Sequence, residues 1–269
     1  MIPGLQTFPT DWRKPPLIRS PWARWSLGLG CGVYLLLTLS TVEVNLARVQ
    51  EGMIRGAAFV AAFFKPDFVT RWDDISAGIL ESLAMTGAAT ALGVLISIPI
   101  GLGAARNISL LPVYLVCRSV ISITRAMQDV IVAIFFVALF GFGPLAGVLT
   151  LIFTTIGFIG KLLAEEIEAM EQDQLEAIRA TGATWLQVIN FAVQPRVAPR
   201  IVGLSIYRLD INFRESAVIG IVGAGGIGAT LNTAFDRYEF GSAAAILLLI
   251  IFIVMVTEYA SGIIRKRLE

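Results

Sequence analysis

The chain has 269 residues, of which 56% are hydrophobic and 15% are charged, and its formal net charge is +1. Soluble domains carry about 25% charged residues, so this composition predicts a protein that lies in a lipid membrane. The chain contains no histidine, which excludes histidine-ligated metal or haem sites and histidine-based catalytic triads. It has no basic tract with interleaved aromatic residues, so nucleic acid is not an expected partner. We expect no cofactor and no metal.

About six apolar stretches follow one another along the chain, each near or above the length of about 20 residues that a helix needs to cross a bilayer. The third is unusually long and is interrupted by polar residues, and the second contains Pro99, where we expect a kink. The sequence therefore predicts an all-α membrane protein. The predicted spans are residues 25–44, 78–104, 112–140, 145–163, 198–222 and 241–263.

The distribution of positive charges predicts the orientation of these spans. Four arginine or lysine residues precede the first span and three follow the last one. Because positively charged flanks stay in the cytoplasm, both termini are predicted to be cytoplasmic. The first span is too long, and its leader too rich in proline, for a cleaved signal peptide. The predicted organisation is a cytoplasmic segment 1–24, a first span with an outer interfacial segment over 25–77, and a core over 78–265 that includes a cytoplasmic segment 164–197.

The cytoplasmic segment is predicted to fold as helix, turn and helix. Acidic or amide residues follow two candidate N-caps at the spacing of a capping box, and a glycine suited to positive φ lies between the two helices. Two interpretations stay open at this point: an ordinary hairpin packed under the bundle, or a docking face for a partner protein. The signals are Asp173 with Glu176, Thr184 with Gln187, Gly182 between them, and Pro195, which we expect to end the second helix.

The stretch "EAIRATGATWLQVINFAVQP" resembles the EAA loop of ABC-importer permeases. The loop's glutamate, first alanine, glycine and proline fall in register, whereas Ile178, Ala192 and Gln194 depart from the family pattern. The resemblance implies that this segment inserts into a cleft of a cytoplasmic ATP-binding subunit and transmits its closure. The candidate coupling residues are Glu176, Ala177, Gly182, Trp185 and Pro195.

A broader resemblance covers about residues 75–265. The stretches "SIPIGLGAARN", "RAMQDVIVAIFFVALFGFGPLAGVL" and "IYRLDINFRESAVIGIVGAGGIG" are most similar to the permease of phosphonate importers, whose close relatives serve phosphite and hypophosphite uptake. The methionine-importer permease is a more distant look-alike. The resemblance implies the type I ABC-importer permease fold and a transport subunit rather than an enzyme.

The same resemblance implies partners and a location. The chain has no P-loop, so ATP hydrolysis is expected in a separate ATP-binding subunit that acts as a dimer. A periplasmic or lipid-anchored binding protein and a second permease copy complete the expected importer in the bacterial inner membrane. The alternatives are a permease for another small solute such as methionine, or an ATP-independent secondary carrier, although no internal repeat of the kind such carriers show is found.

Charged residues with the i, i+4 spacing of an ion pair lie inside two predicted spans, the fifth and the third. Each costs about 2.5–3.5 kcal/mol in a membrane, so they are expected to face protein or water. In the fifth span, Asp210 and Arg214 have the i, i+4 spacing of an ion pair, and Arg208, Asn212 and Glu215 share one helical face that suits a water-filled path. A structural ion-pair network is the alternative, and it stays open. The candidate translocation-pathway residues are Arg208, Asp210, Asn212, Arg214 and Glu215, together with Arg125 and Asp129 of the third span.

The third span carries a second i, i+4 pair, Arg125 and Asp129, which we expect just inside the cytoplasmic end. A gate or coupling role and a salt bridge that closes a helix end are the two interpretations of this pair. Both stay open from the sequence.

The stretch "GIVGAGGIGAT" has the G-x-G-x-x-G spacing of a dinucleotide-binding loop at Gly223, Gly225 and Gly228. That interpretation requires a preceding strand and an acidic residue about 20 positions later, whereas a predicted transmembrane helix precedes these glycines. We interpret them, together with Gly226, as an unwound and closely packed helix end at the outer gate of the pathway.

Overall fold

The computed structural model describes residues 18, 20–41 and 45–268, and in these residues it contains helices and turns but no strand. The predicted all-α class is therefore confirmed for the described part. Most of the predicted cytoplasmic segment 1–24 lies outside the described residues. By internal contacts the chain divides into a unit Met1–Gly56 and a unit Ala57–Glu269.

The first unit contains α1 (Pro21–Thr41) and the start of α2 (Leu46–Ala62). Helix α1 overlaps the predicted first span, and its described side chains are exposed or half-buried. Three glycines and several polar residues lie among its leucines. Its mean hydropathy is therefore lower than that of the later spans.

The count of about six spans requires a correction. In the described residues, four helical stretches are long and apolar enough to cross a membrane, and a fifth is obtained if one bent helix pair counts as a single span. The sequence estimate is higher because it counted α1 as a span. The four stretches are Trp72–Gly103, Pro144–Glu168, Trp185–Asp236 and Phe240–Ile264.

Helices α3 (Trp72–Gly103) and α6 (Pro144–Glu168) pack closely through small residues. A Cβ added at Gly93 would lie 2.7 Å from Cβ of Thr155, and one at Gly101 would lie 2.8 Å from Cγ of Leu163. Glycine is required at these positions because helices in a membrane associate by close van der Waals contact. Helix α3 continues through Pro99.

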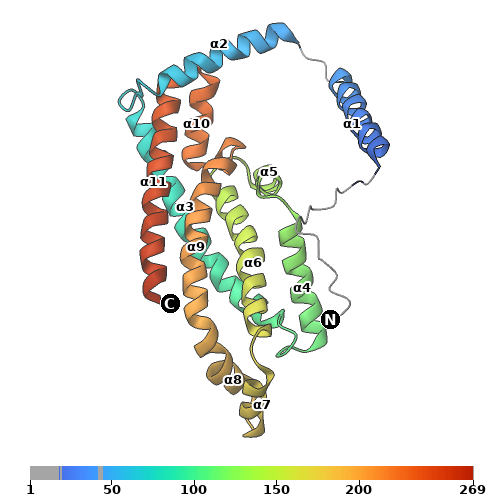
Figure 1. The fold of residues 1–269 in the computed structure, drawn as a ribbon. Coiled ribbons are helices and arrows are strands. Elements are labelled where there is room, and N and C mark those ends of the chain that lie inside the picture. The colour runs from blue at the N-terminus through green and yellow to red at the C-terminus, as the bar shows by residue number, and fades with distance from the viewer. Residues whose placement is uncertain (1–17, 19, 42–44, 269) are drawn as a thin grey trace, which may run out of the picture. The chain divides into compact units, whose positions relative to one another are not determined.

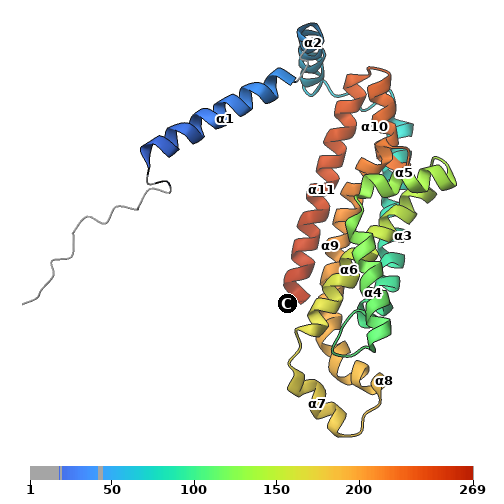
Figure 2. The same cartoon turned by 90° about the vertical axis from the view of Figure 1, so that its right-hand side faces the viewer.

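The predicted third span is two helices, α4 (Leu111–Ala126) and α5 (Asp129–Phe140), which meet at an angle of 96°. Met127 and Gln128 between them are extended, with ψ of 135° and 141°. The polar interruption noted in the sequence is therefore the position at which the chain changes direction. Figures 1 and 2 both show α5 turned across the bundle.

The segment after α6 forms α7 (Gln172–Ala180), α8 (Trp185–Val188), a π-helical turn η1 (Ile189–Val193) and α9 (Gln194–Ile221). Two boundary predictions were wrong. Glu171, not Asp173, is the N-cap of α7. Pro195 does not end a helix, because it lies in the first turn of α9, where a missing N–H is tolerated.

Helices α10 (Gly226–Asp236) and α11 (Phe240–Leu268) complete the second unit. Helix α11 runs beside α9 and α10 (Figures 1 and 2). Phe59 of α2 packs on both helices, with ring centroids 5.4 Å from Phe235 and 5.9 Å from Phe240. We call residues 172–193 the hairpin; Figure 1 shows it at the end of the bundle away from α10.

Candidate functional site

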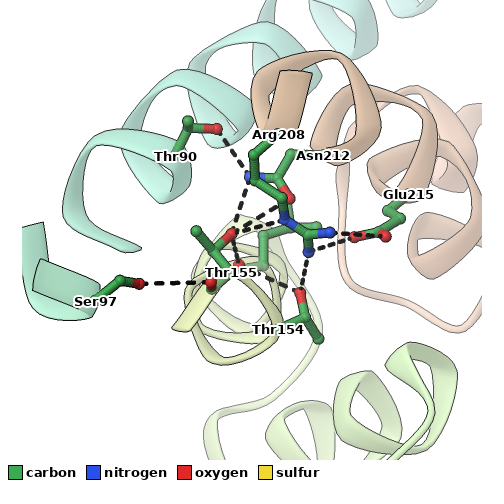
Figure 3. A network of polar contacts seen from close by, with 8 residues as sticks. Thr90, Ser97, Thr154, Thr155, Arg208, Asn212 and Glu215 are labelled. Carbon is green, nitrogen blue, oxygen red and sulfur yellow. Dashed lines mark hydrogen bonds and ion pairs between the residues drawn. The ribbon is translucent and has the colours of Figure 1, made fainter. Parts of the chain in front are cut away.

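A buried network surrounds Arg208 in the middle of α9 (Figure 3). The residue is 4% exposed. Its Nε donates to Oγ1 of Thr155 at 3.1 Å and its Nη2 to Oγ1 of Thr154 at 2.6 Å, both on α6. The two Nη atoms also donate to the carboxylate of Glu215, at 3.3 and 3.0 Å. Arg208 therefore finds its partner at i+7, two turns along its own helix.

Asn212 extends this network to a third helix. Its Nδ2 donates to Oγ1 of Thr90 on α3 at 2.8 Å and to Oγ1 of Thr155 on α6 at 3.2 Å. The predicted shared face of Arg208, Asn212 and Glu215 is confirmed by these contacts. A buried polar group is costly unless it is hydrogen-bonded, and here α3, α6 and α9 supply the partners together.

The predicted pair Asp210–Arg214 is confirmed, with Nη2 of Arg214 3.0 Å from Oδ2 of Asp210. The other carboxylate oxygen accepts a hydrogen bond of 2.8 Å from Oγ1 of Thr257 on α11. The Asp210 side chain is 6% exposed and that of Arg214 is 57% exposed. This pair therefore connects α9 with α11, away from the contacts of Arg208.

The predicted pair Arg125–Asp129 is wrong. Arg125 ends α4 and Asp129 begins α5, and because the chain bends between them they are not one turn apart on one helix. Among the described residues no ion pair joins them. Asp129 instead faces the carboxyl of Glu215. Arg125 was also expected just inside the cytoplasmic end of its span, where the hairpin lies. It instead lies at the opposite end of α4, about 20 Å along the helix from Leu111.

All five predicted coupling residues are exposed, four of them in the hairpin and Pro195 in the first turn of α9. The five are Glu176, Ala177, Gly182, Trp185 and Pro195. Gly182 has φ of +79°, which confirms the predicted glycine turn. Gln187 Oε1 accepts from the backbone N–H of Thr184 at 2.7 Å, which is one half of the predicted capping box.

The sequence interpretation missed the way in which the hairpin is attached to the bundle. Nε1 of Trp185 donates to the carbonyl of Ile108 at 2.9 Å, and Nη2 of Arg179 donates to that of Asn107 at 2.9 Å. Residues 104–110, which join α3 to α4, therefore hold the hairpin. No short motif signals these contacts, because the partners are more than 70 positions apart.

Glu168, at the end of α6, holds the same loop from the other side. Its Oε1 accepts the backbone N–H of Arg106 at 2.9 Å, and its Oε2 lies 2.7 Å from Nη2 of Arg118 on α4. Buried apolar side chains of α6, the loop and the hairpin pack beneath these bonds: Ile108, Leu163, Ile167, Leu175 and Val188.

The glycine-rich stretch forms the turn between α9 and α10. Gly223, Gly225 and Gly226 have φ of +93°, +81° and +70°, which L side chains rarely adopt. Gly228 packs against the backbone of Ala217 and Gly220 in α9. The helix end predicted from the glycines is therefore present; its function as a gate stays a prediction.

Two side chains of α3 bind the start of α10. The backbone N–H of Gly226 donates to Oε1 of Glu81 at 3.0 Å, and that of Ile227 donates to Oγ of Ser82 at 2.9 Å. These bonds satisfy N–H groups that a helix start leaves free. Nearby, hydrogen bonds from Arg71 to Asp74 raise the pKa of its guanidinium. Among the described residues no cluster of histidine, cysteine, aspartate or glutamate side chains is placed to hold a metal ion.

Comparison with known proteins adds three findings. Residues 97–269 match the family described as "Binding-protein-dependent transport system inner membrane component". The chain is 35% identical to the phosphite transport system permease protein PtxC of Stutzerimonas stutzeri, over 98% of both chains. It is 40% identical to the phosphate-import permease protein PhnE of Mycolicibacterium smegmatis over 76% of this chain, which spans only 38% of that relative's length.

The fold has a solved counterpart. An inward-facing structure of the MetNI methionine ABC transporter matches 72% of this chain and 96% of its own, with a TM-score of 0.64 and 23% sequence identity. At this identity the likeness concerns the fold alone.

Proposed function

Since the chain belongs to the family of binding-protein-dependent transport system inner membrane components, we propose that it is the permease subunit of an ABC importer for phosphonate, phosphite or a related phosphorus oxyanion. Its fold is that of a type I ABC-importer permease. The observation that carries the substrate class is the 35% identity to a phosphite permease over 98% of both chains. The likeness to the methionine transporter is lower and supports the fold only.

In the proposed importer, ATP hydrolysis, substrate recognition and the translocation pathway lie in different subunits. Members of this transport family act with an ATP-binding subunit and a substrate-binding protein, and the chain itself is a transport subunit rather than an enzyme. We place ATP hydrolysis in a dimer of cytoplasmic ATP-binding subunits, and initial substrate recognition in a periplasmic or lipid-anchored binding protein. A second copy of this chain completes the pathway in the bacterial inner membrane, with both termini cytoplasmic.

The hairpin is the proposed docking site for the ATP-binding subunit. Its candidate coupling residues are exposed, and a cavity of about 390 Å³ opens beside Gly182, lined also by Ile178, Gln187 and Phe191. The hairpin is attached to the loop before α4 and packs on the end of α6. A force applied at the hairpin therefore reaches α6 directly and α4 through the loop that precedes it.

The proposed translocation pathway follows α9 and its contacts with α5 and α6. Arg208 and Glu215 face this side, and Asn212 bonds to Thr155 of α6 as well as to Thr90 of α3; Asp129 and Arg125 lie at the junction of α4 and α5. The glycine turn is the proposed outer gate, since its backbone conformation depends on three glycines with positive φ.

The test is substrate-dependent ATP hydrolysis by the assembled importer. The chain is purified with its ATP-binding subunit and binding protein, and ATPase stimulation is compared for phosphonates, phosphite, hypophosphite, phosphate and methionine. We expect stimulation by phosphorus oxyanions and none by methionine. Stimulation by methionine alone contradicts the substrate class, and substrate uptake by vesicles that contain only this chain contradicts the ABC-importer proposal.

A further inference from the structure

Two arginines lie against one face of α6. Arg208 donates to Thr154 and its guanidinium carbon lies 5.4 Å from the ring centroid of Phe158. The side chain of Arg125 lies against Gly157, where an added Cβ would be 2.9 Å from Cγ of Arg125. Positions 154, 157 and 158 follow the i, i+3, i+4 spacing of one helical face. Two elements, α4 and α9, therefore bring cations to the same surface of α6.

The two cations differ in how they are neutralised. Arg208 is held by both oxygens of Glu215, whereas exposed Arg125 makes no ion pair or side-chain hydrogen bond within the described part of the chain. Asp129, the first residue of α5, faces Glu215. Arg208, Glu215 and Asp129 thus meet where α5 and α9 come together, and the side chain of Arg125 lies against the neighbouring turn of α6.

The position of Glu215 is the informative feature. Its side chain is 21% exposed, whereas that of Arg208 is 5% exposed, so the carboxylate is the more accessible member of the pair. Arg208 also donates to Thr154 and Thr155, and these bonds do not involve Glu215. A buried ion pair brings little net stability because both charges lose their hydration. A contribution to folding stability is therefore a poor explanation for the presence of the Arg208–Glu215 ion pair.

We propose that Arg208 binds the oxyanion substrate during translocation, and that Glu215 is a tethered anion that occupies Arg208 until the substrate displaces it. This inference rests on the proposed function. A phosphonate or phosphite group presents tetrahedral oxygens that accept two parallel bonds from a guanidinium, as the Glu215 carboxylate does here. Thr154 borders the same site, and the side chain of Arg125 lies against Gly157, three residues further along α6.

Competition by Glu215 also explains how such a site avoids trapping its substrate. A transport pathway requires binding strong enough for entry and weak enough for exit. With Glu215 available to return to Arg208, the substrate leaves without exposing an uncompensated buried cation. Glu215 thus lowers the affinity for the anion and speeds its release.

The test compares two variants with a matched control in the purified complex of permease and ATP-binding subunit, without binding protein. The probe is sodium phosphite, with sodium chloride at equal ionic strength, and the measurement is the phosphite dependence of the thermal unfolding midpoint. Glu215→Gln removes the competing charge. We expect the phosphite concentration that produces a given rise of the midpoint to fall about tenfold, equivalent to about 1.4 kcal/mol, and transport by the full importer to slow.

The double variant Arg208→Gln with Glu215→Gln removes both charges, so it leaves no unpaired buried ion. We expect it to assemble, to lose the phosphite response and to transport at least tenfold more slowly. The control is Arg71→Gln with Glu239→Gln, an ion pair with the same 3.0 Å separation that lies near the start of α3. It is expected to keep the wild-type phosphite response.

An unchanged phosphite response in the double variant overturns the proposal and makes the pair purely structural. If the double variant does not assemble, Arg208→Lys replaces it. A higher phosphite concentration for the same rise of the midpoint supports the site, and an unchanged concentration overturns it. ATPase stimulation of the wild-type importer is measured in parallel. Absence of stimulation by every oxyanion rejects the proposed function, whereas stimulation combined with an Arg208-independent phosphite response rejects only this inference.

Discussion

Gly182 allows the docking function of the hairpin to be separated from its folding. Its φ is +79°, and an added Cβ would meet no other atom of this chain within 4 Å. A substitution therefore costs only the left-handed backbone conformation, about 1–2 kcal/mol for Ala or Trp and less for Asn. For a chain of this size that cost lowers the unfolding midpoint by about 2–8 °C. Gly182→Trp should be no less stable than Gly182→Ala.

Gly182→Ala and Gly182→Trp should therefore differ in affinity for a partner only if that partner contacts Gly182. We expect Gly182→Asn and Gly182→Ala to bind the ATP-binding subunit nearly as the wild type does, and Gly182→Trp to bind at least tenfold more weakly. The assay combines thermal unfolding of the purified permease with titration of the ATP-binding subunit. Gly203→Ala is the control, since Gly203 also has open space around it but lies within α9. Equal affinities of the Ala and Trp variants would refute the reasoning.

Two further predictions concern stability. Gly228→Ala places a Cβ against the backbone of Ala217, which cannot move as a side chain does. We therefore expect the free energy of unfolding to fall by about 3 kcal/mol relative to Gly203→Ala, measured by thermal unfolding. A near-neutral result would contradict the tight contact of α9 and α10. Glu168→Gln weakens the bonds to Arg106 and Arg118, and we expect a loss of about 1–2 kcal/mol because the pair is about a quarter exposed. In a double-mutant cycle with Arg118→Gln the losses should not add, and strict additivity would show that the two side chains do not interact in solution.

Local features were predictable because helix geometry relates near neighbours in the sequence. The pair Asp210–Arg214 and the glycine turn at Gly182 follow from spacings of a few residues, and both are present. The shared face of Arg208 and Glu215 was also predictable, although their direct pairing over two turns was not. The same reasoning failed for Arg125 and Asp129, because it assumes a continuous helix where the chain bends by 96°.

The sequence by itself determined the membrane character, the all-helical class, the hairpin and the residues that carry charge inside the bundle. Only the tertiary structure decided what those charges contact, Thr154 and Thr155 for Arg208 and Thr257 for Asp210. It also decided that the indole N–H of Trp185 in the hairpin donates to the loop carbonyl of Ile108. The physical reason is that a buried polar group must find a hydrogen-bond partner, whereas which helix supplies it depends on packing between segments far apart in the chain. The sequence also predicted that Pro195 ends a helix, whereas in the structure it lies in the first turn of α9.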